Sequence, residues 1–489
     1  MKKAFLLSAI VFFFAFSAFA DGWREGEKEI KVFLNSPADY TLLSDLNLNG
    51  DIYSNKGIAI MYVTPDELLR LDKTGLSYEV LKDDLNEYYR DFWNKDVPPG
   101  YYSYEEIIEI IDSLAQNFPD ICKKEIIGTS MGGRELAVLK ISDNVEIDEA
   151  EAELIIDGGI HGDEIGGAEN LIRFSRKLCY DYGEDFYITN LIDNREIIIY
   201  CMVNPDGRAN MTRYNNNGID LNRDWGYMWN GEGGSPYAYS QQETKAYRDY
   251  MNDNEFVMNV SMHSGTEVFL YAWYYRDNPS PDDSECYFIG NLYSSTSGYS
   301  NLEFGQCATI LYPVNGGSCE SFYGVTGTLG FAQEISNDKQ PSASQATVYY
   351  NWNVTPMLEM IEVSGYGLEG IITDALSGEP VVAAIFVDEY LPNYSDPTVG
   401  DFHKFVMPGT YSITVVANGY ESQTIDNIVV EANSSTTVNF QLQEVESHYA
   451  YRVSSCQIPG NNPGDEGNTP GIIGAPDNIN YSIGKNGWI

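Results

Sequence analysis

Two histidines and a glutamate have the types and spacing of a metal site. His161 and Glu164 stand three residues apart shortly after the strand-like run 151–159, and His263 follows the apolar run 256–262. Both runs predict buried strands, and ligands gather at the carboxyl ends of strands in open α/β sheets. Two imidazoles and one carboxylate leave the fourth tetrahedral position open for water, as in catalytic zinc sites. The sequence therefore predicts one Zn²⁺ held by these three side chains.

Other polar residues add acid–base and anion-binding chemistry. Glu334 lies near the end of the apolar run 329–335, where burial would raise its pKa toward the working range of a general base. Asn222 and Arg223 follow one another, and Arg213 stands nine residues before Asn222. Such a group of donors suits a carboxylate, because the guanidinium fork matches it bidentately. An H-x-x-E pair alone would be weak evidence, but these additional sites favour the metal interpretation over a solvated loop.

Residues 97–365 resemble the zinc metallocarboxypeptidases of the carboxypeptidase A/B superfamily. The resemblance is carried by His161-x-x-Glu164, the motifs Asn204-Pro205-Asp206-Gly207 and Asp220-Leu221-Asn222-Arg223, and His263, in the order in which that family has them. It implies that Asp220 orients His161 and that Glu334 acts as the general base. It also implies one zinc ion per catalytic domain and peptide or protein substrates with a free C-terminus.

The same resemblance implies a set of substrate-binding residues. Asn222, Arg223 and Arg213 would hold the substrate's terminal carboxylate, and Arg213 would also polarise the scissile carbonyl. Tyr312 would close over the bound terminus from a mobile loop. Cys319 falls at the floor of the specificity pocket, where a small neutral thiol favours apolar or broad selectivity, whereas the neighbouring Glu320 leaves a basic preference open.

The elements that must position these residues form an α/β fold. Alternating strand and helix patterns over 97–365 predict a mixed, mostly parallel sheet flanked by helices. Residues 366–443 lose helical periodicity and predict a small all-β sandwich, which resembles the transthyretin-like domain of regulatory carboxypeptidases such as carboxypeptidases E, N and D. Residues 21–95 predict a small α+β unit that resembles a pro-region, and 444–489 a linker with the start of a truncated further domain.

One short segment of the N-terminal unit imitates a calcium loop. Residues 45–51 carry the sequence DLNLNGD, but the twelfth position is Lys56 where a bidentate glutamate is needed. A turn-rich connection is therefore the favoured interpretation of this segment.

Composition and the N-terminus limit the partners and the location. The 489-residue chain carries a formal net charge of −43 without a Lys/Arg-rich run, which argues against nucleic acid. Residues 1–20 have the charged, apolar and small-residue order of a signal peptide, so cleavage after Ala20 and a secreted, periplasmic or cell-surface protein are expected. No later segment is apolar enough to insert into a membrane, and a monomer is expected.

The odd number of cysteines, seven, leaves at least one unpaired within the chain.

The combined expectation is a secreted zinc metallocarboxypeptidase in which a zinc-activated water, with Glu334 as base, hydrolyses the C-terminal peptide bond. Two alternatives remain open. One is a peptidase of cell-wall muropeptides on the same scaffold. The other is a catalytically dead surface protein that binds peptides or glycans.

Overall fold

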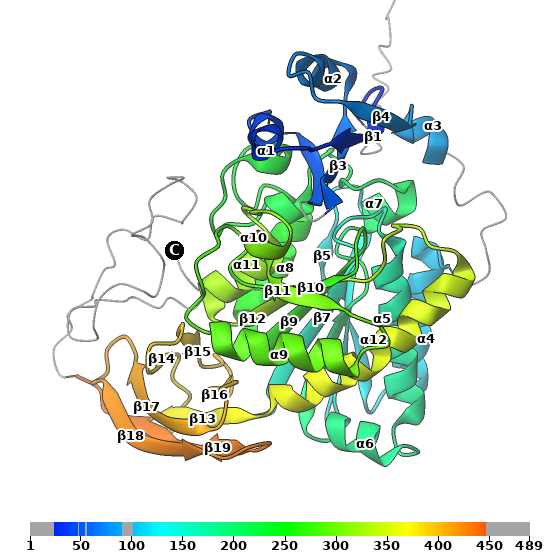
Figure 1. Ribbon diagram of the computed structural model, residues 1–489. Coiled ribbons are helices and arrows are strands. Elements are labelled where there is room, and N and C mark those ends of the chain that lie inside the picture. Colours follow the sequence, from blue (N-terminus) through cyan, green and yellow to red (C-terminus); the bar gives the residue numbers. More distant parts are fainter. Residues whose placement is uncertain (1–23, 47, 54–55, 90–100, 446–489) are drawn as a thin grey trace, which may run out of the picture.

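The computed structural model describes residues 24–46, 48–53, 56–89 and 101–445. The expected signal peptide, and nearly all of the expected linker and further domain (444–489), lie outside the described residues. Within them the chain forms three units, each with its own sheet or pair of sheets (Figure 1).

The first unit is a four-stranded antiparallel sheet covered by two short helices. Its strands lie in the order β2 (Asn49–Tyr53), β3 (Ile58–Val63), β1 (Lys28–Phe33) and β4 (Tyr78–Lys82). The helices α1 (Pro37–Ser44) and α2 (Pro65–Asp72) each begin with a proline after a Ser or Thr capping box, and α3 (Leu85–Tyr89) follows. Leu43 of α1 and Leu71 of α2 pack on Ile30, Val32 and Met61 of the sheet, which gives this unit a separate apolar core.

The expectation of a turn-rich connection over residues 45–51 is wrong for its last part. Asn49–Tyr53 is strand β2, and Asp51 is the register partner of Ile60 in β3. The polar composition of the segment predicts a turn, but strand formation depends on pairing and burial more than on intrinsic preference. Pairing with β3 and burial of Tyr53 therefore decide this segment.

The central unit confirms the expected mixed, mostly parallel sheet with helices on both faces. Its eight strands lie in the order β11 (Glu303–Gln306), β10 (Val268–Tyr271), β12 (Leu329–Glu334), β9 (Phe256–His263), β7 (Ala152–Gly158), β8 (Arg195–Tyr200), β6 (Glu135–Ile141) and β5 (Cys122–Thr129). The strands β12, β9, β7 and β8 run parallel to one another, as do β10 and β11, whereas the pairs β10/β12, β6/β8 and β5/β6 are antiparallel.

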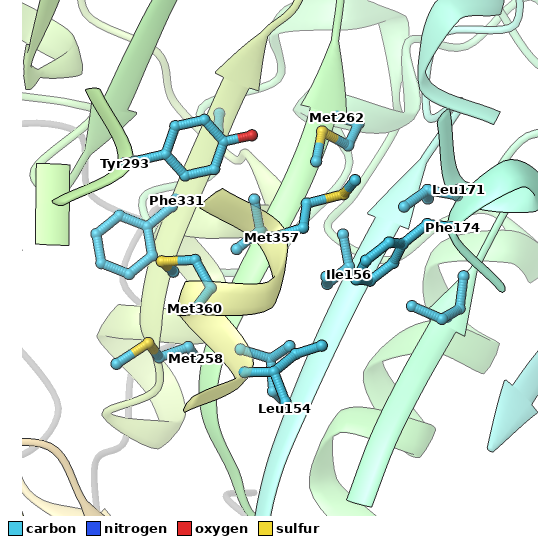
Figure 2. Close-up of a cluster of buried hydrophobic side chains, with 14 of the residues drawn as sticks. Leu154, Ile156, Leu171, Phe174, Met258, Met262, Tyr293, Phe331, Met357 and Met360 are labelled. Atoms are coloured by element: carbon cyan, nitrogen blue, oxygen red, sulfur yellow. The ribbon is translucent and has the colours of Figure 1, made fainter. Parts of the chain in front are cut away.

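Each face of this sheet has its own core because alternate side chains of a strand point to opposite faces. Leu154 and Ile156 of β7 pack in the larger core with Met357 and Met360, which Figure 2 shows beneath the sheet, whereas Ile155 packs in the smaller core on the other face. The larger core is covered by α4 (Tyr104–Asn117), α5 (Ile165–Asp181), α6 (Phe186–Ile192), α9 (Asp283–Thr296) and α12 (Ala343–Ser364). The smaller core is covered by α8 (Gln242–Asp253) and by two further segments, one with Trp225 and one with Phe322.

Shorter helices occupy the loops near the strand ends. They are α7 (Pro205–Asn210), the 3₁₀ helices η3 (Leu221–Arg223) and η4 (Glu232–Gly234), α10 (Cys307–Ile310), α11 (Ser318–Ser321) and the π-helical turn η5 (Phe322–Thr326).

The third unit is an all-β sandwich. One sheet contains β16 (Asp401–Lys404), β13 (Gly367–Asp374), β19 (Ser435–Thr437) and β20 (Phe440–Leu442). The other has the order β15 (Asn393–Tyr394), β14 (Ala384–Val387), β17 (Gly409–Val416) and β18 (Gln423–Val430). Buried polar contacts dock the sandwich on the central unit: Lys404 Nζ lies 3.1 Å from Asp282 Oδ1, and Asn393 Nδ2 donates to Glu255 Oε1. The transthyretin-like identity of this unit stays a prediction.

Candidate active site

Neighbouring parallel strands bring the predicted metal ligands together. His161 and Glu164 lie in the loop that joins β7 to α5, and Glu164 is the residue before the first turn of α5. His263 is the last residue of β9, which pairs directly with β7. Loop and strand end at the same edge of the sheet, so residues far apart in the chain meet in one place.

The three side chains converge with their metal-binding atoms. The Nδ1 atoms of His161 and His263 lie 2.9 and 3.0 Å from Oε1 and Oε2 of Glu164, and all three residues are buried. Their ligand atoms lie within 4.8 Å of one another. Burial raises the pKa of Glu164, but the nearby His161 and Lys339 lower it by a larger amount. The pKa of Glu164 therefore lies well below its usual value. Two imidazole nitrogens and an ionised carboxylate are the donor set that zinc prefers.

A buried carboxylate supports the outer side of the first histidine. Asp220 Oδ1 lies 3.2 Å from His161 Nε2, while Asp220 Oδ2 accepts a hydrogen bond of 3.0 Å from Nε of Arg213. A carboxylate bonded to one ring nitrogen orients the ring and leaves the other nitrogen free to bind a metal. Asp220 therefore lies where the sequence predicted it, and Arg213 extends the same network.

The loop that carries His161 packs very closely on α7. A Cβ on Gly162 would lie 1.9 Å from the carbonyl carbon of Gly207, so only glycine fits there. Two other residues of the same motif hold the surrounding loops. Asn204 Oδ1 accepts a hydrogen bond from the Gly207 amide. Asp206 accepts hydrogen bonds from Ser130, Gly132 and Arg134. The Asn204–Gly207 motif therefore positions the metal loop and provides no side chain to the cavity.

Glu334 lies beside the metal cluster at the end of β12. It is the register partner of His263, and its Oε2 is buried without a hydrogen-bond partner among the described residues. Burial raises the pKa of Glu334 to about 8.

The cavity at this edge collects nearly all the predicted residues. Its lining includes the three metal-ligand candidates together with Arg213, Asn222, Arg223, Tyr312, Cys319 and Glu334. Asn222 Oδ1 accepts a hydrogen bond from the Ser318 amide, and Arg223 Nη1 donates to the Asn222 carbonyl. Asp220 lies behind His161 and not in this cavity.

One end of the cavity is apolar and contains two sulfur atoms. Leu270, Tyr274, Cys307 and Ala332 line it with Cys319, whose Sγ donates to the Phe331 carbonyl. Burial raises the pKa of the Cys319 thiol to about 12, so the thiol is neutral. Glu320 is fully buried, its Oε2 accepts from the Tyr274 amide, and burial raises its pKa to about 8.

Sequence reasoning missed two charged residues in the same cluster. Asp51 of β2 accepts a hydrogen bond of 2.9 Å from the Tyr312 hydroxyl and lies 3.7 Å from Arg213 Nη1. Lys339, in the loop after β12, lies 3.1 Å from Glu164 Oε1 and 3.5 Å from Asp51 Oδ2. Neither residue belongs to a recognisable motif, although Lys339 stands out as a cation near Glu334 in a very acidic chain.

The N-terminal unit therefore restricts the cavity. Figure 1 shows this unit over the central unit, at the end opposite the β-sandwich. Burial raises the pKa of Asp51, but Arg213 and Lys339 lower it by more, so the pKa lies below its usual value and the group is an anion. The cavity volume is about 40 Å³, which holds a few water molecules, whereas ligand pockets typically measure roughly 300–1,000 Å³.

Fold and site define a metal-dependent hydrolase of peptides, and the comparisons with known proteins identify the family. The zinc carboxypeptidase family matches residues 107–354, half of the chain, and the chain belongs to that family. It is a zinc-dependent metallopeptidase, which confirms the expected cofactor class.

Sequence relatives and a similar solved structure are also carboxypeptidases. Carboxypeptidase SOL1 of Arabidopsis thaliana is 28% identical over 379 residues, covering 73% of this chain and 75% of the relative. The carboxypeptidase N catalytic chain of Mus musculus is 27% identical over 421 residues, covering 76% and 91%. Among solved structures, carboxypeptidase A from Helicoverpa armigera aligns with a TM-score of 0.57 at 19% identity, covering 69% of this chain and 97% of that one. At that identity the likeness shows the shared fold.

The structure also bears on membrane insertion and on the cysteines, for the described residues only. No helix among them is long and apolar enough to cross a membrane. Six of the seven cysteines lie in the described part and are all buried free thiols, Cys319 among them.

Proposed function

We propose that this chain is an exported carboxypeptidase that removes single residues from the C-terminus of peptides, with His161, Glu164 and His263 as zinc ligands. The observation that carries the proposal is the common cavity in which the metal cluster, Glu334 and the donors Arg213, Asn222 and Arg223 meet.

The mechanism follows from what each side chain can do. Bound zinc supplies a Lewis acid that activates water and polarises a carbonyl. Glu334 accepts the proton of the attacking water and returns it to the leaving amine, and its raised pKa suits both transfers. Arg213 is an ionised, buried donor that stabilises the developing oxyanion by charge already in place. Asn222 and Arg223 hold the terminal carboxylate, which restricts cleavage to the last peptide bond.

Two residues complete the substrate site. Tyr312 covers the bound terminus once its hydroxyl leaves Asp51. Cys319 lies at the apolar end of the cavity and receives the terminal side chain, with apolar residues favoured because the thiol is neutral. Glu320 is occupied by the Tyr274 amide, which supports its role as a structural residue of the pocket wall.

We also propose that residues 21–95 act as a pro-region that limits activity in the full chain. Asp51 binds Arg213 and Tyr312, two residues assigned to the substrate, and Lys56 Nζ donates to Asn337 Oδ1 beside the cavity. A peptide carboxyl terminus cannot reach the metal cluster while β2 stays in this position.

The test is mass spectrometry of a peptide library, varied at the C-terminal residue, after incubation with zinc-loaded protein that lacks residues 1–20. Loss of single C-terminal residues, blocked by C-terminal amidation and absent in Glu334→Gln, would support the proposal. Release from muropeptides alone would favour the cell-wall peptidase. No trimming of either substrate, even after removal of residues 21–95, would favour a binding protein.

A further inference from the structure

Lys339 places a buried ammonium group at the metal cluster, and the proposed mechanism does not use it. The side chain is 12% exposed, and its Nζ lies 4.8 Å from the centre of the Tyr62 ring. Three carboxylates surround Nζ: Glu164 at 3.1 Å, Asp51 at 3.5 Å and Asp163 at 3.6 Å. Nζ nevertheless makes no well-formed hydrogen bond to any described residue. A buried ammonium in that state favours an additional anionic partner.

The Asp51 carboxylate marks the place of such a partner. Its Oδ1 accepts from the Tyr312 hydroxyl and faces Arg213, and its Oδ2 faces Lys339. Asp51 belongs to the N-terminal unit, whereas the three residues that hold it belong to the central unit. When β2 withdraws, an ammonium, a guanidinium and a hydroxyl remain around a position that fits a carboxylate.

This position differs from that of the Asn222–Arg223 pair. Asn222 Oδ1 accepts from the Ser318 amide at the start of α11, and Arg223 Nε lies 4.0 Å from Glu232 in η4. Lys339 instead contacts Glu164 and Asp163 in the loop before α5. A substrate whose terminal carboxylate lies on Asn222 and Arg223 reaches Lys339 with the part of its chain that precedes the scissile bond.

The remaining charges leave Lys339 available to a substrate. Arg213 stays bonded to Asp220 at 3.0 Å. The Glu164 carboxylate is a proposed metal ligand, so its charge is shared with the ion. Lys339 then keeps Asp163 at 3.6 Å as its main partner, a distance too long for a hydrogen bond.

We propose that Lys339 forms a second carboxylate-binding subsite, and that the enzyme favours peptides with an acidic side chain on the amino side of the scissile bond. This inference rests on the proposed carboxypeptidase function. Lys339 acts here as a specificity residue and takes no part in bond cleavage.

The experiment compares two peptides that differ only by Glu or Gln at the penultimate position, in full chains that carry Asp51→Ala. We expect kcat/KM to favour the Glu peptide by about fivefold, mainly through KM, because one partly buried ion pair contributes about 1 kcal/mol. Adding Lys339→Met should abolish the preference, so that kcat/KM for the Glu peptide falls to the value for the Gln peptide in the same variant. Lys339→Arg should retain the preference, and the nearby exposed Lys56→Met serves as the matched control.

Equal losses on both peptides in Lys339→Met, with rescue by Lys339→Arg, would mean a structural role and overturn the inference. If the Asp51→Ala chain cleaves neither peptide, binding of glutarate to the same zinc-loaded variants is measured by calorimetry. Weaker glutarate binding in Asp51→Ala/Lys339→Met than in Asp51→Ala would support the subsite although the proposed function fails. Equal binding in both variants would overturn the subsite itself.

Discussion

His263 and Glu334 are register partners at the ends of the parallel strands β9 and β12. The pairing places the candidate general base beside a candidate zinc ligand without any side-chain bond between them. The position of Glu334 therefore depends on the sheet backbone, and a conservative change of its side chain should leave the neighbouring ligands undisturbed.

Glu334→Gln should lower kcat by about 10²–10⁴-fold, because the amide cannot accept the proton of the attacking water. Zinc content, measured by atomic absorption, should stay at the wild-type level. The control is Glu421→Gln, the same change at an exposed position. The neighbouring Gln333 is buried and is not suitable for a control substitution. Wild-type activity in Glu334→Gln would reject the general-base assignment.

Asp51→Asn should activate the full chain by roughly tenfold, since the amide loses its attraction to Arg213 and Lys339 and the N-terminal unit then releases the cavity more often. The assay is hydrolysis of a C-terminal reporter peptide before and after the change. Asp45→Asn, at an exposed position of the same unit, is the control and should have no effect. An unchanged rate in Asp51→Asn would count against the proposed pro-region.

Asp220→Asn should weaken zinc binding by about 10–100-fold, because His161 loses the carboxylate that orients its ring. The measurement is competition for zinc with a chromophoric chelator, accompanied by circular dichroism to verify folding. The exposed Asp249→Asn provides a control for the loss of one negative charge. Unaltered zinc affinity in a folded Asp220→Asn protein would remove Asp220 from the metal site.

Glu153→Gln should make the protein more stable at pH 8 and leave its stability at pH 4.5 almost unchanged. Burial raises the pKa of Glu153 well above its usual value of 4.5, and Glu196 and Asp396 raise it further. The folded chain therefore keeps a proton that the unfolded chain releases above pH 4.5. The stabilising contribution of this group is complete below that pH and is lost as the pH rises through the folded-state pKa.

Because glutamine imitates the protonated group, the melting temperature of Glu153→Gln at pH 8 should rise by about 2–4 °C per kcal/mol of restored stability. Differential scanning calorimetry at both pH values checks this, with Glu421→Gln as the exposed control. A gain of equal size at pH 4.5 and pH 8 would show that the effect does not come from titration.

Local sequence was sufficient to predict the residues that lie at strand ends. His161 lies shortly after β7, and His263 and Glu334 end β9 and β12; these three strands are buried and parallel, and their carboxyl ends meet at one edge. The sheet then brings these residues together, and their positions do not depend on the conformation of the loops between the strands. The hydrogen bond between Asp220 and Arg213 was not predicted, because the resemblance assigned Asp220 to His161 and Arg213 to the substrate.

The roles of Asp51 and Lys339 depended on tertiary structure. Asp51 lies in a polar segment that indicates a turn, and only pairing with β3 and docking on the central unit turn its carboxylate toward Arg213. Lys339 acquires its role from carboxylates of two separate segments, the loop that holds Asp163 and Glu164 and the strand of another unit that holds Asp51. A short range of sequence encodes strands through burial and periodicity, but the electrostatic environment of a side chain depends on groups brought near it by folding, and no local pattern records them.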